Sequence, residues 1–131
     1  FPSIAKTLNH MVVTDRIWMG RFTGKLSDHK RLDEAPYDDF AALTAAREAE
    51  DQRIIAFFKE LTQTRIDSVF EYKNTAGEPK SSEMLPVLAH FFNHQTHHRG
   101  QAHAMISSTR VAPPPLDLIY FIYEDKEALV G

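Results

Sequence analysis

The chain has 131 residues, of which 43% are hydrophobic, and this suits one domain (residues 1–131) with a substantial core. The net charge is −3 and no segment concentrates lysine or arginine. Nothing therefore favours nucleic-acid binding, which relies on basic side chains to neutralise phosphates. The absence of cysteine excludes disulfides, thiolate metal ligands and a cysteine nucleophile, and it fits a reducing cytoplasm. No apolar run approaches the roughly 20 residues that cross a bilayer, so we expect no membrane partner.

Apolar residues at helical spacing predict two long helices in the first half of the chain. The first runs from about Ser3 to Phe22, and Gly24 ends it. The second begins at Asp38 or Asp39, either of which could cap it, and it reaches about Leu61. Its middle turn, residues 47–53, is charged and is expected to be solvated. Its inner face is expected to comprise Phe40, Leu43, Ile54, Phe57, Phe58 and Leu61.

The spacing of apolar residues changes in "SVFEYKNTAGEPK", residues 68–80, which predicts a small β-hairpin turning at "NTAG". A third helix is predicted from about Ser82, with Ser81 or Ser82 as its cap, to about Ser107. After the prolines at 113–115, "LDLIYFIYED" (residues 116–125) predicts a short final helix. Four helical segments with apolar stripes and one hairpin indicate an all-α helical bundle with a small β insertion.

The third predicted helix is rich in histidine. The stretch "FFNHQTHHRGQAH", residues 91–103, contains four of the seven histidines, and His90 precedes it. On a helical wheel, His94 and His98 fall on the shoulder of the apolar face, whereas His90 and His97 lie further out. The i,i+4 spacing stacks His94 and His98 on successive turns, close enough to share one cation. The competing interpretation is that both are hydrogen-bonded core residues, because histidines without partners are costly to bury.

Neutral imidazole is a good ligand for zinc, nickel, copper or iron, so the pattern favours a divalent metal. The sequence contains no H-E-x-x-H, the motif of the familiar zinc proteases. No glutamate is followed three residues later by histidine, which excludes the di-iron carboxylate bundle signature.

Two segments resemble the DinB family of bacterial metal-binding helical bundles: "HFFNHQTHHRGQ" (residues 90–101) and "LNHMVVTDRIWMGRF" (residues 8–22). The resemblance implies a four-helix bundle with a metal bound by His10, His94 and His98, zinc or nickel above all. Three histidines leave a coordination position open, as in catalytic sites. His10 is assigned through the resemblance alone, because it lies off the apolar line of its helix. The alternative is that it forms a polar cap at the end of the bundle.

The resemblance also implies a missing element. DinB proteins usually carry another helix before the one that begins near Ser3, and this sequence lacks it. Without that helix, the largely apolar first helix is expected to be exposed. Family members often form homodimers, so self-association is expected.

Several residues around the histidines have two interpretations each. Asp15 falls within an apolar stripe, so it either accepts a hydrogen bond from a ligand histidine or pairs with Arg16 or Arg99. Asn93, Arg99 and Gln101 either orient the imidazoles or a substrate, or are solvated. Gly100 is expected to permit a close helix approach. Trp18, Tyr120 and Tyr123 are core residues or pocket walls, and His29 and His103 are surface residues.

The DinB superfamily includes thiol-dependent transferases, so the resemblance implies a metal-dependent transferase that uses a small-molecule thiol. A metal could lower the pKa of such a thiol, and a chain without cysteine would take the thiol from a cosubstrate. Hydrolysis is the second enzymatic possibility, although no carboxylate can be assigned as its general base. The alternative is a non-catalytic metal-binding stress-response protein, in which His90 or His97 would complete a closed site.

Overall fold

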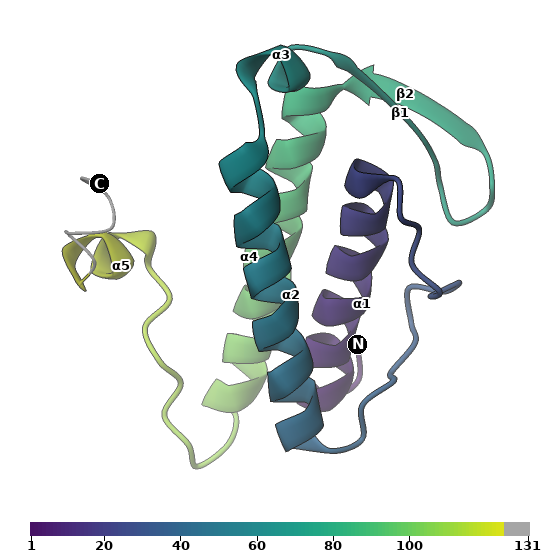
Figure 1. Ribbon diagram of the computed structural model, residues 1–131. Helices are drawn as coiled ribbons and strands as arrows, with labels where there is room; N and C mark the ends of the chain where they lie inside the picture. The colour runs from purple at the N-terminus through teal and green to yellow at the C-terminus, as the bar shows by residue number, and fades with distance from the viewer. Residues whose placement is uncertain (125–131) are drawn as a thin grey trace.

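A computed structural model describes residues 1–124. Its elements are α1 (Ile4–Thr23), α2 (Phe40–Glu60), α3 (Gln63–Ile66), β1 (Val69–Lys73), β2 (Pro79–Glu83), α4 (Met84–Ser107) and α5 (Leu118–Glu124). The long helices α1, α2 and α4 pack side by side, and α1 contacts both of the others (Figure 1). The hairpin extends from the end of the bundle where α4 begins, and α5 stands apart at the end of an extended segment (Figure 1).

The predicted all-α class with a β-hairpin is confirmed, and the first two helices have nearly the predicted bounds. Ser3 caps α1, because its hydroxyl accepts a hydrogen bond from the Lys6 amide at 3.2 Å. Gly24 ends α1 with a φ of 75°, a left-handed conformation that glycine adopts without a Cβ clash. Asp39 caps α2 through a 2.9 Å bond from the Ala42 amide.

The predicted inner face and solvated turn of α2 are wrong at specific residues. Phe40 leaves 71% of its surface exposed, because it occupies the first turn, where α2 overhangs the bundle. In the charged middle turn, Glu50 is buried and bonds Arg53 at 3.1 Å. Arg47 reaches into the bundle and bonds Asp15. Charged residues line this contact because they find partners across the α1–α2 interface.

The hairpin pairs β1 and β2 antiparallel, with Phe70 opposite Ser82. This pairing corrects the predicted start of the third helix. Ser81 and Ser82 belong to β2, and α4 begins at Met84 after Glu83, which makes no capping bond with its side chain. Backbone pairing with β1 continues up to the first residue of the helix, whose amide donates to the Ser68 carbonyl at 2.9 Å. The short helix α3, which leads into the hairpin, was not predicted.

The core has two parts, and α1 contributes to both. The larger cluster lies between the C-terminal half of α1, the hairpin and the start of α4, and contains Met19, Phe22, Phe70, Met84, Val87, Leu88 and Phe91. The smaller one joins Val12 of α1 to Leu43 and Ala46 of α2. The expected exposure of α1 is therefore wrong, since α2, α4 and the loop after α1 surround it.

Exposed apolar side chains are concentrated on α5. The predicted final helix is present from Leu118, and the last residue of the prediction, Asp125, lies outside the described residues. Six consecutive large apolar side chains, Leu118 to Tyr123, are 37–70% exposed, which includes both tyrosines considered as pocket walls. In residues 1–124, no helix combines the length and apolar character needed to traverse a bilayer.

Candidate metal centre

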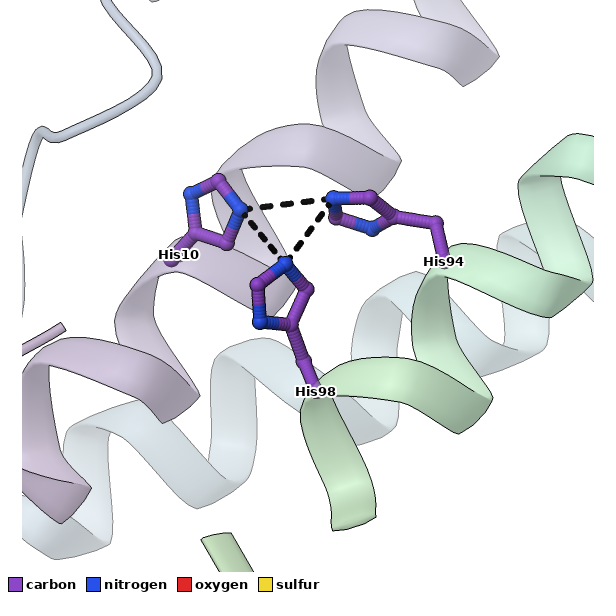
Figure 2. A group of neighbouring side chains, drawn as sticks. All are labelled: His10, His94 and His98. Atoms are coloured by element: carbon purple, nitrogen blue, oxygen red, sulfur yellow. Dashed lines mark hydrogen bonds between the residues drawn. The ribbon is translucent and has the colours of Figure 1, made fainter. Parts of the chain in front are cut away.

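Three imidazoles from two helices converge at the α1–α4 interface. His10 projects from α1, and His94 and His98 project from successive turns of α4 (Figure 2). The Nε2 atom of His98 lies 3.1 Å from those of His10 and His94, and the third pair of Nε2 atoms is 3.4 Å apart. His10 and His98 are buried and His94 is half-buried. The structure thus brings together the three side chains that the sequence singled out.

The far nitrogens of two rings have their own partners. The Nδ1 atom of His10 lies 2.6 Å from the Leu32 carbonyl oxygen, which can only accept, so this nitrogen carries the proton. The Nδ1 atom of His98 lies 2.7 Å from Oε1 of Gln101 and donates to it in the same way. When only Nδ1 carries a proton in each ring, the Nε2 atoms of His10 and His98 present lone pairs to each other across 3.1 Å. Two facing lone pairs repel unless a proton or a metal ion lies between them.

The spacing of the nitrogens suits a metal ion. Zinc–imidazole bonds of about 2.0–2.1 Å in a tetrahedron place neighbouring ligand nitrogens about 3.3–3.4 Å apart. The observed separations of 3.1–3.4 Å approach this edge length. In residues 1–124, His10, His94 and His98 are the group of potential ligands whose donor atoms all lie within 4.8 Å of one another. The cluster could therefore hold a metal ion.

Burial favours the uncharged form of two of the three rings, which is the form that binds a metal. Desolvation is the main cause that lowers the pKa of His94 to about 4, and the neighbouring His98 contributes in the same direction. Desolvation also lowers the pKa of His10, and this outweighs the opposing effect of the Leu32 carbonyl. At neutral pH these two rings are uncharged.

The loop between α1 and α2 is attached to α1 beside His10. The buried Asn9 side chain donates to the Tyr37 carbonyl and accepts from the Tyr37 amide, both at 2.9 Å. This pair of bonds holds the end of the loop that carries Leu32, the partner of His10. The sequence analysis missed Asn9, although its position directly before the histidine in "LNHM" was a signal.

Behind the cluster, a buried polar network joins the three long helices. Asp15 of α1 is 2% exposed, accepts from Arg47 of α2 at 2.7 Å, and accepts from Gln95 of α4 at 2.5 Å. The predicted partners Arg16 and Arg99 are wrong, because Asp15 faces α2 and α4 at once. Burial raises the pKa of Asp15 to about 6, against the lowering effect of Arg47. Gln95 was also missed, although it directly follows His94.

The other polar residues of α4 differ in whether they contact the histidine cluster. Gln101 orients a ring of the cluster, whereas Arg99 bonds Thr96 and Asn93 is exposed. His90 and His97 are exposed and lie outside the three-histidine group.

Three further expectations about single residues can be compared with the structure. A Cβ on Gly100 would meet nothing within 4 Å, so the expected close helix approach there is wrong among the described residues. His29 is half-buried rather than on the surface, because its Nδ1 bonds Glu34 at 2.7 Å. Trp18 packs against the core and contacts the His90 ring at 5.4 Å.

Comparisons with known proteins show the family of the chain. The chain is 29% identical to Protein DinB of Bacillus subtilis (strain 168) over 136 residues, covering 96% of the chain and 76% of that relative. Among solved structures, none matched the chain significantly. The model of the DinB family matches residues 1–128, almost the whole chain, and the protein therefore belongs to the DinB family.

Proposed function

We propose that the protein binds a divalent metal, zinc or nickel, through His10, His94 and His98, and that it acts as a transferase on a small-molecule thiol. The observation that carries this proposal is the convergence of three Nε2 atoms at 3.1–3.4 Å, with the lone pairs of His10 and His98 facing each other. Among the histidine and carboxylate side chains of the described residues, only these three imidazoles gather at this point.

The chain's own groups prepare the site for a ligand. The Leu32 carbonyl and Gln101 fix the orientation of two rings, and burial keeps His10 and His94 uncharged. A divalent metal bound there would supply Lewis acidity, which lowers the pKa of a coordinating thiol and makes it a nucleophile at neutral pH. The thiol must come from a cosubstrate, because the chain has no cysteine.

Hydrolysis is the less favoured reaction, because the three-histidine group contains no carboxylate that could act as its general base. Hydrolysis normally requires a general base within hydrogen-bond reach of the attacking water. The buried carboxylate nearest in sequence to His10 is Asp15, and both of its oxygens accept bonds from Arg47 and Gln95. It is therefore committed to the helix interface.

The alternative, a non-catalytic metal-binding stress protein, calls for a closed site with a fourth protein ligand. His90 and His97, the two candidates for that ligand, lie outside the three-histidine group. Their position supports an open site. A measurement of catalytic turnover distinguishes the transferase from the non-catalytic metal-binding protein.

Metal content tests the site. We expect purified protein to bind about one equivalent of zinc or nickel by elemental analysis, and His94→Ala and His98→Ala to lose it. His97→Ala and His103→Ala are the matched controls, since each removes a histidine of α4 outside the cluster. Circular dichroism should show that all four variants fold. Unchanged metal content in both cluster variants would overturn the assignment.

Activity tests the transferase. The metal-loaded protein should accelerate the addition of at least one bacterial thiol to a chromogenic electrophile, and His98→Ala should reduce the rate to the uncatalysed level. A loaded protein that turns over none of the thiols would favour the non-catalytic alternative.

We also propose that the chain self-associates. Support comes from the six exposed apolar side chains of α5, since monomeric proteins rarely expose contiguous apolar patches of that extent. Light scattering after size-exclusion chromatography should give a dimer mass, and a monomer mass at micromolar concentration would contradict the proposal.

A further inference from the structure

A cavity lies beside the C-terminal half of α1, away from the histidine cluster. Its volume is about 340 Å³, toward the lower end of the range of about 300–1,000 Å³ for small-molecule sites. Its walls come from the C-terminal half of α1, from the loop that follows and from β1 with its turn. The loop packs closely on α1 because Gly20 has no side chain there: a Cβ would lie 2.8 Å from the Ser27 amide nitrogen.

Arg21 of α1 lines this cavity in an unusual setting. Its guanidinium carbon lies 4.5 Å from the centroid of the Trp18 ring and 5.0 Å from that of the Tyr72 ring. Contacts with aromatic rings leave the N–H groups of a guanidinium free to donate hydrogen bonds. Within residues 1–124, Arg21 makes no side-chain hydrogen bond or salt bridge. Desolvation lowers the pKa of Arg21, as expected for a cation that has lost water and gained no carboxylate partner.

The charges around the cavity are unbalanced. Lys30 and Lys73 also line it, and Glu71 is the one carboxylate among its lining residues. Two other titratable residues line the cavity: Tyr72, which contacts Arg21, and His29, which bonds Glu34 outside the lining. A site with three cations and one anion, in a protein of net charge −3, attracts negatively charged ligands.

We propose that this cavity binds a small molecule through a carboxylate or phosphate group held by Arg21. The planar donor edge of a guanidinium matches two oxygens of such a group, and the contacts with two aromatic rings restrain the side chain, which reduces the entropy lost on binding. Lys30 and Lys73 add charge at the rim. Ile17 and Leu26 supply apolar surface for the carbon part of the ligand.

This site is separate from the metal centre. On α1, Arg21 is 11 residues from His10, which is about 16 Å along the helix axis at about 1.5 Å per residue. The proposal therefore does not depend on metal binding and can be tested in its absence.

Trp18 gives a direct signal, because it is the single tryptophan of the chain and contacts Arg21. Metal-free protein should be titrated at constant ionic strength with succinate, with inorganic phosphate and with neutral succinamide. We expect a saturable change in fluorescence with succinate or phosphate, and none with succinamide. Saturation by one oxyanion alone identifies the group that the site prefers. The Arg21 Nε–H resonance should shift over the same concentration range in an NMR titration.

Variants locate the binding. By calorimetry, Arg21→Lys should weaken binding about tenfold, because it keeps the charge but loses the two-pronged donor, and Arg21→Gln should abolish it. The matched control is Arg110→Gln, the same charge change at an exposed residue outside the cavity. His98→Ala should bind like the wild type, which separates this site from the metal centre. Absence of saturable binding to both oxyanions, or equal affinity in Arg21→Gln, would overturn the proposal.

Discussion

Two glycines inside long helices should respond in opposite ways to alanine. In an open helical position, glycine to alanine stabilises a protein by about 1 kcal/mol, because alanine has the higher helix propensity. Gly100 of α4 is such a position, since an added Cβ meets nothing within 4 Å. At Gly20 of α1, the added Cβ would lie 2.8 Å from the Ser27 amide nitrogen and 3.0 Å from the Lys25 carbonyl oxygen. Both are backbone atoms, so the loop itself must move.

Overpacking of this kind costs about 1–3 kcal/mol. On balance this cost exceeds the stabilisation that alanine gives through its higher helix propensity. We therefore expect Gly20→Ala to lose about 1 kcal/mol and Gly100→Ala to gain about 1 kcal/mol. For a domain of this size, the difference of about 2 kcal/mol corresponds to about 8 °C between their melting temperatures. Urea denaturation measures this difference in the free energy of unfolding, provided that both variants show the same dependence on urea concentration. A Gly20→Ala variant as stable as Gly100→Ala would refute the close packing of the loop, and destabilisation by Gly100→Ala would refute the open surface on α4.

Three further substitutions probe the buried polar groups. Because burial lowers the pKa of His94 to about 4, the unfolded chain binds more protons, so metal-free protein should lose stability from pH 6.5 downward toward pH 4. In acid denaturation, the stability of a His94→Gln variant should depend less on pH than that of the wild type. Arg47→Met should cost about 3 kcal/mol at pH 7.5, because it leaves the Asp15 carboxylate buried without its cationic partner. Loss of Arg47 raises the pKa of Asp15 further, so the cost should shrink as the pH falls toward about 6; a cost independent of pH would count against the pair. Asn9→Ala should cost about 2 kcal/mol and speed hydrogen exchange at the Tyr37 amide, and unchanged exchange there would argue against the clamp.

The periodicity of apolar residues located the histidines whose orientation depends on the apolar face of one helix. It missed side chains whose position depends on contacts with a second segment. The wheel placed His94 and His98 toward the bundle because α4 has one apolar face that defines an inside. It could not place His10, because α1 is buried on most of its surface and has no single inner stripe. Only the resemblance of "LNHM" to a family pattern assigned that residue.

The remaining misses have a common physical origin. Gln95 and Asn9 are polar residues that the wheel treats as solvent-facing, yet both are buried because an acceptor or donor on another segment meets them. Ser81 and Ser82 are good helix caps, but pairing with β1 takes their backbone into the hairpin. In each case the deciding partner lies on another segment of the chain.

The buried polar groups of α1 explain how the three long helices of residues 1–124 hold the histidine cluster in register. Asn9 bonds the loop, His10 meets the imidazoles of α4, and Asp15 bonds both α2 and α4. An apolar interface alone tolerates sliding, because dispersion contacts are similar at neighbouring registers, whereas an unpaired buried polar group costs about 1–3 kcal/mol. A slide of one turn along α1 would break the bond from Gln95 to Asp15 and separate His10 from His98 at the same time. The position of the three nitrogens is therefore fixed by the packing of the helices as a whole.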